Sequence, residues 1–232
     1  MKNKIYNSFD EAVADIPNGS TIMSPGFGQV GVPRNLLAAL SRQGAKDLTA
    51  VSNNAGTLDD KIDIGTLIES GQVKKMICAF TAPTHPSQVT PFVKMYNDDE
   101  IDAELVPQGT LAERMRAASA GIGGFYTPTS VGTELAEGKE HREINGRIHV
   151  LEYPLPGDFA LIRAWRADTF GNLQFRMAQR NFNPIMATAA RITIVEVEDA
   201  IVEVGEIDPD HVHVPGVYVD RLIKIPSDGI FE

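Results

Sequence analysis

The segment from Asn18 to Ala39 constrains the fold more than any other part of the chain, because it joins three local signals in one order. Thr21-Ile22-Met23 is a short apolar run, a glycine-rich loop follows it, and an amphipathic helix begins near Pro33. Proline suits the first helical position, where its missing N–H leaves no hydrogen bond unmade. A helix N-terminus carries unpaired backbone N–H groups and a partial positive charge. We therefore expect a strand, a loop and a helix that together bind an anionic or phosphorylated ligand.

The glycines of this loop allow two interpretations. Residues 26–31, Gly-Phe-Gly-Gln-Val-Gly, match G-x-G-x-x-G, the fingerprint of dinucleotide-binding proteins. That fingerprint also needs an acidic residue at the end of the second strand, where it binds a ribose hydroxyl. Here the second expected strand, 48–52, runs into Asn53-Asn54-Ala55-Gly56, and the next acid is Asp59. The missing acid counts against a dinucleotide site, and a tight connection without a ligand is the other interpretation of so short a pattern.

Strands and helices are expected to alternate along the rest of the chain. Apolar runs predict strands at 48–52, 75–80, 104–107, 159–165 and 191–197, with strand-like pieces at 212–214 and 217–219. Helical periodicity and capping residues predict helices at 10–16, 64–69 and 110–120, and one that begins with Asn183-Pro184. Asn145-Gly146, within 142–152, predicts the turn of a β-hairpin. The polar residues 53–60 follow a strand, so they line a ligand cleft or form an exposed turn.

Length and charge limit the class of protein. A chain of 232 residues can bury a full core, and we expect residues 1–232 to form a single domain. The net charge of -10 counts against nucleic acid as a partner. No apolar run approaches the roughly 18 residues that a membrane span needs, and the first residues lack the apolar centre of a signal peptide. Because the one cysteine, Cys78, cannot form an internal disulfide, we expect a cytoplasmic protein.

Candidate nucleophiles and metal ligands are few. Cys78 lies inside an apolar run, where a packed thiol is more common than a reactive one. Residues 117–121, Ala-Ala-Ser-Ala-Gly, are close to G-x-S-x-G, but Ser119 follows a helix, whereas a nucleophile elbow follows a strand. His211 and His213 alternate onto one face, which is a weak signal for a metal site when nothing else supports it. We therefore expect no catalytic nucleophile and no metal in this chain.

Three separated motifs resemble, in order, the small A (alpha) chain of the family I CoA-transferases. The first has Asn18-Gly19, Ile22-Met23, Gly26-Phe27, Gly31 and Pro33; the others are residues 107–114 with 121–129, and residues 178–184. The resemblance covers nearly the whole chain. It departs at Ser24-Pro25, where the family usually has an apolar residue and its first glycine, and the effect on the loop is open because Pro25 fixes φ and lacks a donor.

The resemblance implies the fold and the division of labour. The fold would be α/β, with an open and mostly parallel twisted sheet, helices on both faces and a β-rich second half. In the family, the B subunit contributes a glutamate that attacks the acyl-CoA and becomes a glutamyl-CoA thioester, which is covalent catalysis by a carboxylate. This chain would then hold no catalytic residue. Its partner would be the B subunit, in a heterodimer or an A₂B₂ assembly, and CoA thioester would be a substrate, with no permanently bound cofactor.

The resemblance also implies which residues position the substrate. Gly26, Phe27, Gly28 and Gly31 would bring backbone N–H groups and a ring to the acyl pocket. Gln108 would hydrogen-bond the substrate, the alternative being an exposed turn residue, and Asn53 and Asn54 are further candidates. Arg180 and Asn181 would serve an interface with another subunit or cap the next helix.

The motifs at residues 52–56 and 139–151 are nearest to those of the enzymes that act on 3-oxoadipate. We therefore expect CoA transfer from succinyl-CoA to a 3-oxoacid, with 3-oxoadipate favoured over acetoacetate. A dinucleotide-binding regulatory module is the alternative from another class.

Overall fold

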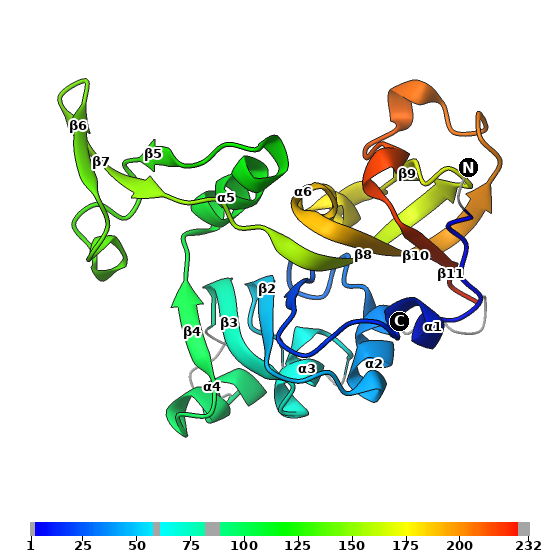
Figure 1. The fold of residues 1–232 in the computed structure, drawn as a ribbon, viewed down its shortest axis with the longest axis horizontal. Helices are drawn as coiled ribbons and strands as arrows, with labels where there is room; N and C mark the ends of the chain where they lie inside the picture. The colour runs from blue at the N-terminus through cyan, green and yellow to red at the C-terminus, as the bar shows by residue number, and fades with distance from the viewer. Residues whose placement is uncertain (1–2, 58–60, 82–88, 227–232) are drawn as a thin grey trace.

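One large sheet organises the chain in the computed structural model, which describes residues 3–57, 61–81 and 89–226 (Figure 1). Its strands, in spatial order, are β11 (Arg221–Lys224), β10 (Ala190–Val202), β8 (Gly157–Asp168), β1 (Thr21–Met23), β2 (Leu48–Asn54), β3 (Val73–Phe80) and β4 (Asp102–Leu105). Every neighbouring pair in this order is parallel. The short β9 (Leu173–Gln174) pairs antiparallel with β8. The predicted open and mostly parallel sheet is confirmed.

The strand order reverses between β1 and β8. From β1 the chain steps outward through β2, β3 and β4, and it later fills the other side with β8, β10 and β11. Ligand clefts in open α/β sheets form at such a reversal, outside the carboxyl ends of the strands. Residues 24–33, which we call the glycine loop, leave the carboxyl end of β1. The topology therefore places the most distinctive sequence motif at this position.

Helices cover both faces of the sheet, as predicted (Figure 1). One face packs against α1 (Phe9–Val13), α2 (Arg34–Gln43), α3 (Ile64–Glu69) and α4 (Pro91–Asn97), and the other against α5 (Gln108–Ala120) and α6 (Asn183–Ala189). The apolar stripe of α2, with Leu36, Leu37 and Leu40, is fully buried against the first face. These two packed layers hold the carboxyl edge of the sheet rigid beneath the glycine loop.

A small antiparallel sheet projects from the body as an arm, drawn in green in Figure 1. Its strands, in the order β5-β7-β6, are β5 (Phe125–Thr127), β7 (Arg147–Glu152) and β6 (His141–Ile144), and the 3-10 helix η1 (Glu134–Ala136) precedes β6. The predicted hairpin turn is confirmed, with positive φ of 52° at Asn145 and 75° at Gly146. The β-rich second half therefore combines this arm with the long strands β8 and β10.

The ends of several elements differ from the prediction. Strands β2, β3, β8 and β10 are longer than their apolar runs, and the helix expected at 110–120 begins at Gln108. The strand-like pieces expected at 212–214 and 217–219 do not form strands, and only Val214 makes an isolated antiparallel bridge, with Leu173. That region holds the 3-10 helices η3 (Pro209–His211) and η4 (Gly216–Tyr218), and the last strand is β11. Proline lacks a ladder donor, so Pro209 and Pro215 disfavour a strand there.

Candidate functional site

Gln108 and Asn53 meet at the carboxyl edge of the sheet. Gln108 is the first residue of α5, and its Nε2 donates a hydrogen bond of 2.7 Å to Oδ1 of Asn53. Asn53 is 1% exposed, whereas Gln108 faces solvent. The prediction that both residues lie in loops is wrong, because Asn53 belongs to β2 and Gln108 opens α5. The contact joins two residues 55 positions apart that the sequence motifs had nominated separately.

Asn54 does not join this contact. It is the last residue of β2, and its Oδ1 accepts a hydrogen bond of 3.1 Å from the N–H of Gly56. A side chain that closes a turn on its own backbone stabilises the chain reversal. The loop expected over 53–60 therefore begins after Asn54, and residues 58–60 lie outside the described residues. Of the two asparagines, Asn53 is the better placed to act with Gln108.

The glycine loop folds as a tight turn with an exposed tip. Phe27 and Val30 exchange backbone hydrogen bonds of 3.1 and 3.3 Å, and the side chain of Phe27 is 57% exposed. Gly28 has a φ of +59° and open space where a side chain would point. Gly31 has a φ of +75°, and a Cβ there would lie 2.6 Å from Nδ2 of Asn181. Gly31 is therefore required by packing, whereas Phe27 and Gly28 face the open side.

The start of α2 does not offer an anion site. The carboxylate of Glu196, which is fully buried on β10, accepts hydrogen bonds of 2.9 and 3.1 Å from the N–H groups of Asn35 and Leu36. The N–H of Arg34 donates to the carbonyl of Val32. Pro33 precedes the helix as its N-cap residue and does not occupy its first turn. An internal carboxylate thus fills the place predicted for a phosphate, which also argues against the dinucleotide interpretation.

Gln29 ties the glycine loop to α3. Its Nε2 donates a hydrogen bond of 2.8 Å to Oδ2 of Asp63, the residue that caps α3. Its Oε1 accepts one of 2.8 Å from Nη2 of Arg34, the first residue of α2. Burial raises the pKa of Asp63, although hydrogen bonds from Thr57, Gly65 and Gln29 oppose that shift. The sequence does not predict this clamp, because nothing local relates Gln29 to Asp63.

An arginine-rich pocket of about 580 Å³ lies beside the glycine loop. We call it the arginine pocket; its lining includes Arg34, Arg163, Arg176, Gln179, Glu198 and Met177. Glu198 binds Nη2 of Arg163 at 3.1 Å and accepts a hydrogen bond of 2.9 Å from Gln179. At its rim the side chain of Met177 is 85% exposed and that of Val30 is 46% exposed. A positive hollow with an apolar rim therefore adjoins the exposed tip of the loop.

Arg180 and Asn181 belong to the segment that supports the loop. Asn181 donates a hydrogen bond of 3.0 Å from Nδ2 to the carbonyl of Val30, and Asn183 donates one of 3.1 Å to the carbonyl of Gly31. Arg180 ends the 3-10 helix η2 (Met177–Arg180). Neither Arg180 nor Asn181 caps α6, whose N-cap residue is Phe182. The predicted cap is therefore wrong, and the prediction of an interface with another subunit stays a prediction.

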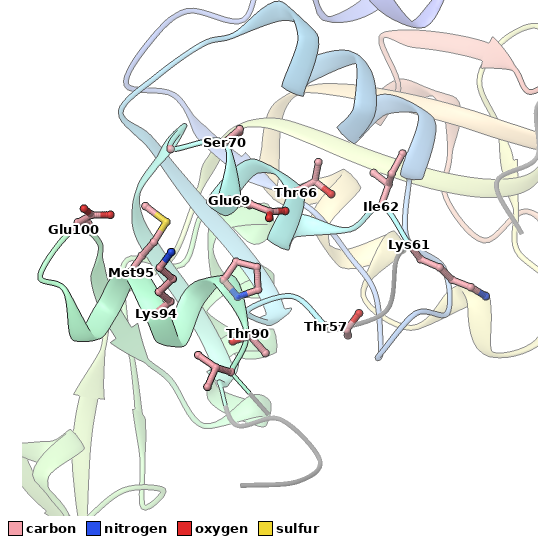
Figure 2. Close-up of a pocket in the computed structure, with 13 residues that line it drawn as sticks. Thr57, Lys61, Ile62, Thr66, Glu69, Ser70, Thr90, Lys94, Met95 and Glu100 are labelled. Atoms are coloured by element: carbon pink, nitrogen blue, oxygen red, sulfur yellow. The ribbon is translucent and has the colours of Figure 1, made fainter. Parts of the chain in front are cut away.

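A larger groove lies elsewhere on the molecule (Figure 2). It has a volume of about 830 Å³, runs between α3 and α4, and is lined by Lys61, Thr66, Thr90 and Lys94 among others. No residue of the glycine loop lines it, nor do Asn53, Asn54 or Gln108, although Thr57 of the polar segment 53–60 does. We therefore take the carboxyl edge of the sheet, and not this groove, as the candidate site.

The remaining candidate nucleophiles and metal ligands do not form a reactive site, and the side chain of His211 is 64% exposed. Cys78 is fully buried, and burial raises the pKa of its thiol to about 11. Ser119 lies within α5 and not at a strand-to-helix turn. His213 stacks on Phe175 and accepts a hydrogen bond from its N–H at Nδ1. Among the described residues, no three histidine, cysteine, aspartate or glutamate side chains gather as a metal site, and no helix is long and apolar enough to cross a membrane.

Comparisons with known proteins show which family the sequence matches. The family model described as coenzyme A transferase matches residues 6–224. The A chain of a probable succinyl-CoA:3-ketoacid coenzyme A transferase of Bacillus subtilis is 50% identical over 220 residues, covering 95% of this chain and 89% of that protein. The A chain of the 3-oxoadipate CoA-transferase of Pseudomonas putida is 49% identical over 227 residues, covering 97% of this chain and 95% of that protein.

A solved structure gives the same fold. The glutaconate coenzyme A-transferase from Acidaminococcus fermentans superimposes with a TM-score of 0.81 at 24% identity, covering 96% of this chain and 76% of that one. At this identity the similarity speaks for the fold alone. The sequence relatives carry the functional information, and their names give the acceptor as a 3-ketoacid in some and as 3-oxoadipate in others.

Proposed function

Because the chain belongs to the coenzyme A transferase family, we propose that it is the A chain of an enzyme that transfers CoA from succinyl-CoA to a 3-oxoacid, with the nucleophilic glutamate supplied by the B subunit. We also expect the assembly to work in the cytoplasm. The names of the relatives support the assignment as an A chain. The acceptor acid, the partner and the location are our inferences for this chain.

The observation that carries the proposal is a polar site in which, among the residues that the structure describes, the nearby carboxylates are engaged within the chain. In the described part of the carboxyl edge, Asp63 accepts hydrogen bonds from Thr57, Gly65 and Gln29. Glu196 is buried beneath α2, and Glu198 is bound by Arg163 and Gln179. A nucleophilic carboxylate must reach the thioester carbonyl of the substrate. Since these three are engaged within the chain, the nucleophile is expected from a partner.

Gln108 and Asn53 are suited to stabilise the charge that the attack creates. When a carboxylate attacks a thioester carbonyl, negative charge develops on the carbonyl oxygen. An amide group has two donor hydrogens, and Nε2 of Gln108 uses one of them on Asn53. The second hydrogen is available on an exposed side chain whose orientation is fixed by that contact. We infer that Gln108 donates to the substrate oxygen and that Asn53 holds Gln108 in place.

The tip of the glycine loop is suited to meet the partner. Phe27, Val30 and Met177 are 57%, 46% and 85% exposed; Val30 and Met177 line the arginine pocket, and Phe27 pairs with Val30 across the turn. Exposed apolar groups that cluster beside a polar site are typical of an interface. We infer that the B subunit covers this surface and closes the acyl pocket over Phe27 and Gly28.

The arginine pocket favours a dicarboxylic acceptor. 3-Oxoadipate carries a second carboxylate, which acetoacetate lacks. The pocket is lined by Arg34, Arg163 and Arg176. Arg163 is paired with Glu196 and Glu198 and Arg34 is bonded to Gln29, whereas among the described residues Arg176 forms no ion pair. Arginine pairs with carboxylates through bidentate hydrogen bonds. This supports 3-oxoadipate over acetoacetate, in line with the motifs at residues 52–56 and 139–151.

The experiment is to mix the chain with a B subunit, reconstitute the pair, and measure CoA transfer from succinyl-CoA to 3-oxoadipate and to acetoacetate. We expect activity from the pair, none from either chain alone, and a higher kcat/KM for 3-oxoadipate. A pair that prefers acetoacetate would correct the acceptor only. A pair without transfer to any 3-oxoacid would contradict the proposed function.

A further inference from the structure

Glu196 is a buried acid that the proposed reaction does not use. It lies on β10 between the apolar residues Val195 and Val197, and it is 0% exposed. A buried carboxylate is costly unless its position provides compensating contacts. The contacts of Glu196 therefore indicate why the chain keeps an acid at this position.

The carboxylate of Glu196 lies against the first turn of α2, directly after the glycine loop. Its Oε2 accepts the N–H groups of Asn35 and Leu36 at 2.9 and 3.1 Å, across 161 and 160 residues of sequence. Helices usually obtain this contact from a local serine, threonine or aspartate at the N-cap. Here Pro33 is the N-cap residue and makes no side-chain hydrogen bond to the helix. The glycine loop thus ends in a residue that cannot cap, and a distant strand supplies the acceptor.

Arg163 connects this contact to the far side of the loop. It is the direct cross-strand neighbour of Glu196 on β8, and its Nη1 lies 3.7 Å from Oε1 of the carboxylate. The backbone N–H of Arg163 donates to Oδ1 of Asn183 at 2.8 Å, and Nδ2 of Asn183 donates to the carbonyl of Gly31 at 3.1 Å. The loop exit is therefore held at Gly31 from one side and at α2 from the other, through one pair of strands.

We propose that Glu196 is a positioning residue of the CoA-transfer site, which fixes the exit of the glycine loop by anchoring the first turn of α2 to β10. This inference rests on the proposed function for its link to catalysis. The anchor itself is a property of this chain alone. The anchor depends on the length of the Glu196 side chain, because that length brings Oε2 within hydrogen-bond distance of both N–H groups.

Two substitutions separate reach from charge. Glu196→Gln keeps the reach and an acceptor oxygen but removes the charge, and Glu196→Asp keeps the charge but withdraws the oxygen by one methylene. In the reconstituted pair we expect Glu196→Asp to lower kcat/KM by about tenfold. The shorter side chain loses about one hydrogen bond to α2, and the free energy of one such bond corresponds to a change of about that size. Glu196→Gln should stay within about threefold of the wild type. Glu152→Gln is the control, because Glu152 is another buried acid, paired with Lys139 in the arm.

The second readout does not need activity. In the full chain without its partner, Glu196→Asp should accelerate amide exchange at Asn35 and Leu36 and in the glycine loop, whereas Glu196→Gln and Glu152→Gln should not. Failure of the wild-type pair to transfer CoA would concern the proposed function and leave this readout intact. Equal activity of the two Glu196 variants, a more active Glu196→Asp, or unchanged exchange at Asn35 and Leu36 would overturn the proposal.

Discussion

The amide of Gln108 is fixed by a contact that leaves its other donor hydrogen free. It bonds to Asn53 at 2.7 Å and is exposed at the first turn of α5. An exposed amide adds little to packing, so its contribution should appear in catalysis and not in folding. Its neighbour Asn53 is 1% exposed and is a support for Gln108.

We expect Gln108→Ala to lower kcat/KM of the reconstituted pair on the order of 100-fold, as the loss of a donor to a developing oxyanion does elsewhere. The free energy of unfolding should change by no more than about 0.5 kcal/mol. Steady-state kinetics and urea unfolding measure the two quantities. Glu113→Gln is the matched control on the same helix, because Glu113 forms an exposed pair with Arg116. An unfolded Gln108→Ala protein, or one with wild-type kinetics, would contradict this role.

Glu196 should also make stability depend on pH. Burial raises the pKa of its carboxyl from 4.5 to about 7, although Arg163 and the N–H groups of α2 oppose that shift. Glu198 shares Arg163, and the β11 neighbour of Glu196 is the apolar Ile223. Because the folded-state pKa is above the unfolded value, the contribution to stability is full below pH 4.5 and is lost as the pH rises through 7.

We therefore expect the stability difference between the wild type and Glu196→Gln to fall with rising pH, by an amount on the order of 3 kcal/mol between the two pKa values. Other titrating groups cancel in this difference, since both proteins share them. Urea unfolding at several pH values provides the measurement. A difference that is independent of pH would show that Glu196 does not titrate in this range.

Among the elements, the glycine loop combines two kinds of position. A Cβ at Gly31 would meet Asn181, Gln179 and Asn183. A Cβ at Gly28 would point into open space, so only the positive φ favours glycine there. Both glycines match the same sequence fingerprint, and only the surroundings distinguish them. The loop is therefore built with a fixed exit and a free tip.

Substitution by alanine should separate the two glycines. Gly28→Ala should lower stability by about 1 kcal/mol, because alanine disfavours a positive φ. Gly31→Ala should lower it by about 3 kcal/mol or more, because its Cβ would also lie 2.6 Å from Asn181 and 2.8 Å from the carbonyl of Gln179. Thermal and urea unfolding compare the two variants. Equal losses would mean that the loop relaxes freely around Gly31.

The strands and helices were largely predictable, because their signals are local. Apolar runs placed β1, β2, β3, β8 and β10, and Asn145-Gly146 placed the hairpin of the arm. The predicted start of α5 is two residues too late, and the predicted loop includes Asn53 and Asn54 although they belong to β2. Two polar residues at the end of a strand are compatible with a strand and with a loop, and only their pairing with the neighbouring strand decides between the two.

The contacts that shape the site were much less predictable. The sequence motifs nominated Gln108 and Asn53, but Glu196, Asp63 and Arg163 belong to distant segments. An acid within the apolar strand Ile192–Val197 was the one available signal for Glu196. No sequence rule told which groups it would face, because that depends on the register between β8 and β10.

At the scale of the whole molecule, the arm differs from the body. Neither buried cluster of the body includes a described residue of β5, β6 or β7, and Ile148 and Tyr153 are 41% and 63% exposed. Val150 of β7 is buried, but small antiparallel sheets with so little buried apolar surface are marginally stable. The arm is nevertheless tethered, since Nε of Arg114 on α5 donates to the carbonyl of Tyr153 at 2.9 Å.

We expect amide hydrogens in the arm to exchange faster than those of β8 and β10 in the chain without its partner. Local opening needs less free energy where few apolar groups are buried. Hydrogen exchange followed by mass spectrometry resolves the two regions in one experiment. Protection of β5, β6 and β7 as strong as that of β8 would mean that the arm opens only when the whole chain unfolds.

The division of the active site between two chains is the central claim for the molecule as a whole, and the most direct test is to locate the CoA adduct. The reconstituted pair is incubated with succinyl-CoA and digested, and peptides that carry CoA are identified by mass spectrometry. We predict a CoA thioester on one glutamate of the partner and none on any peptide of this chain. A CoA adduct on a residue of this chain would contradict the account.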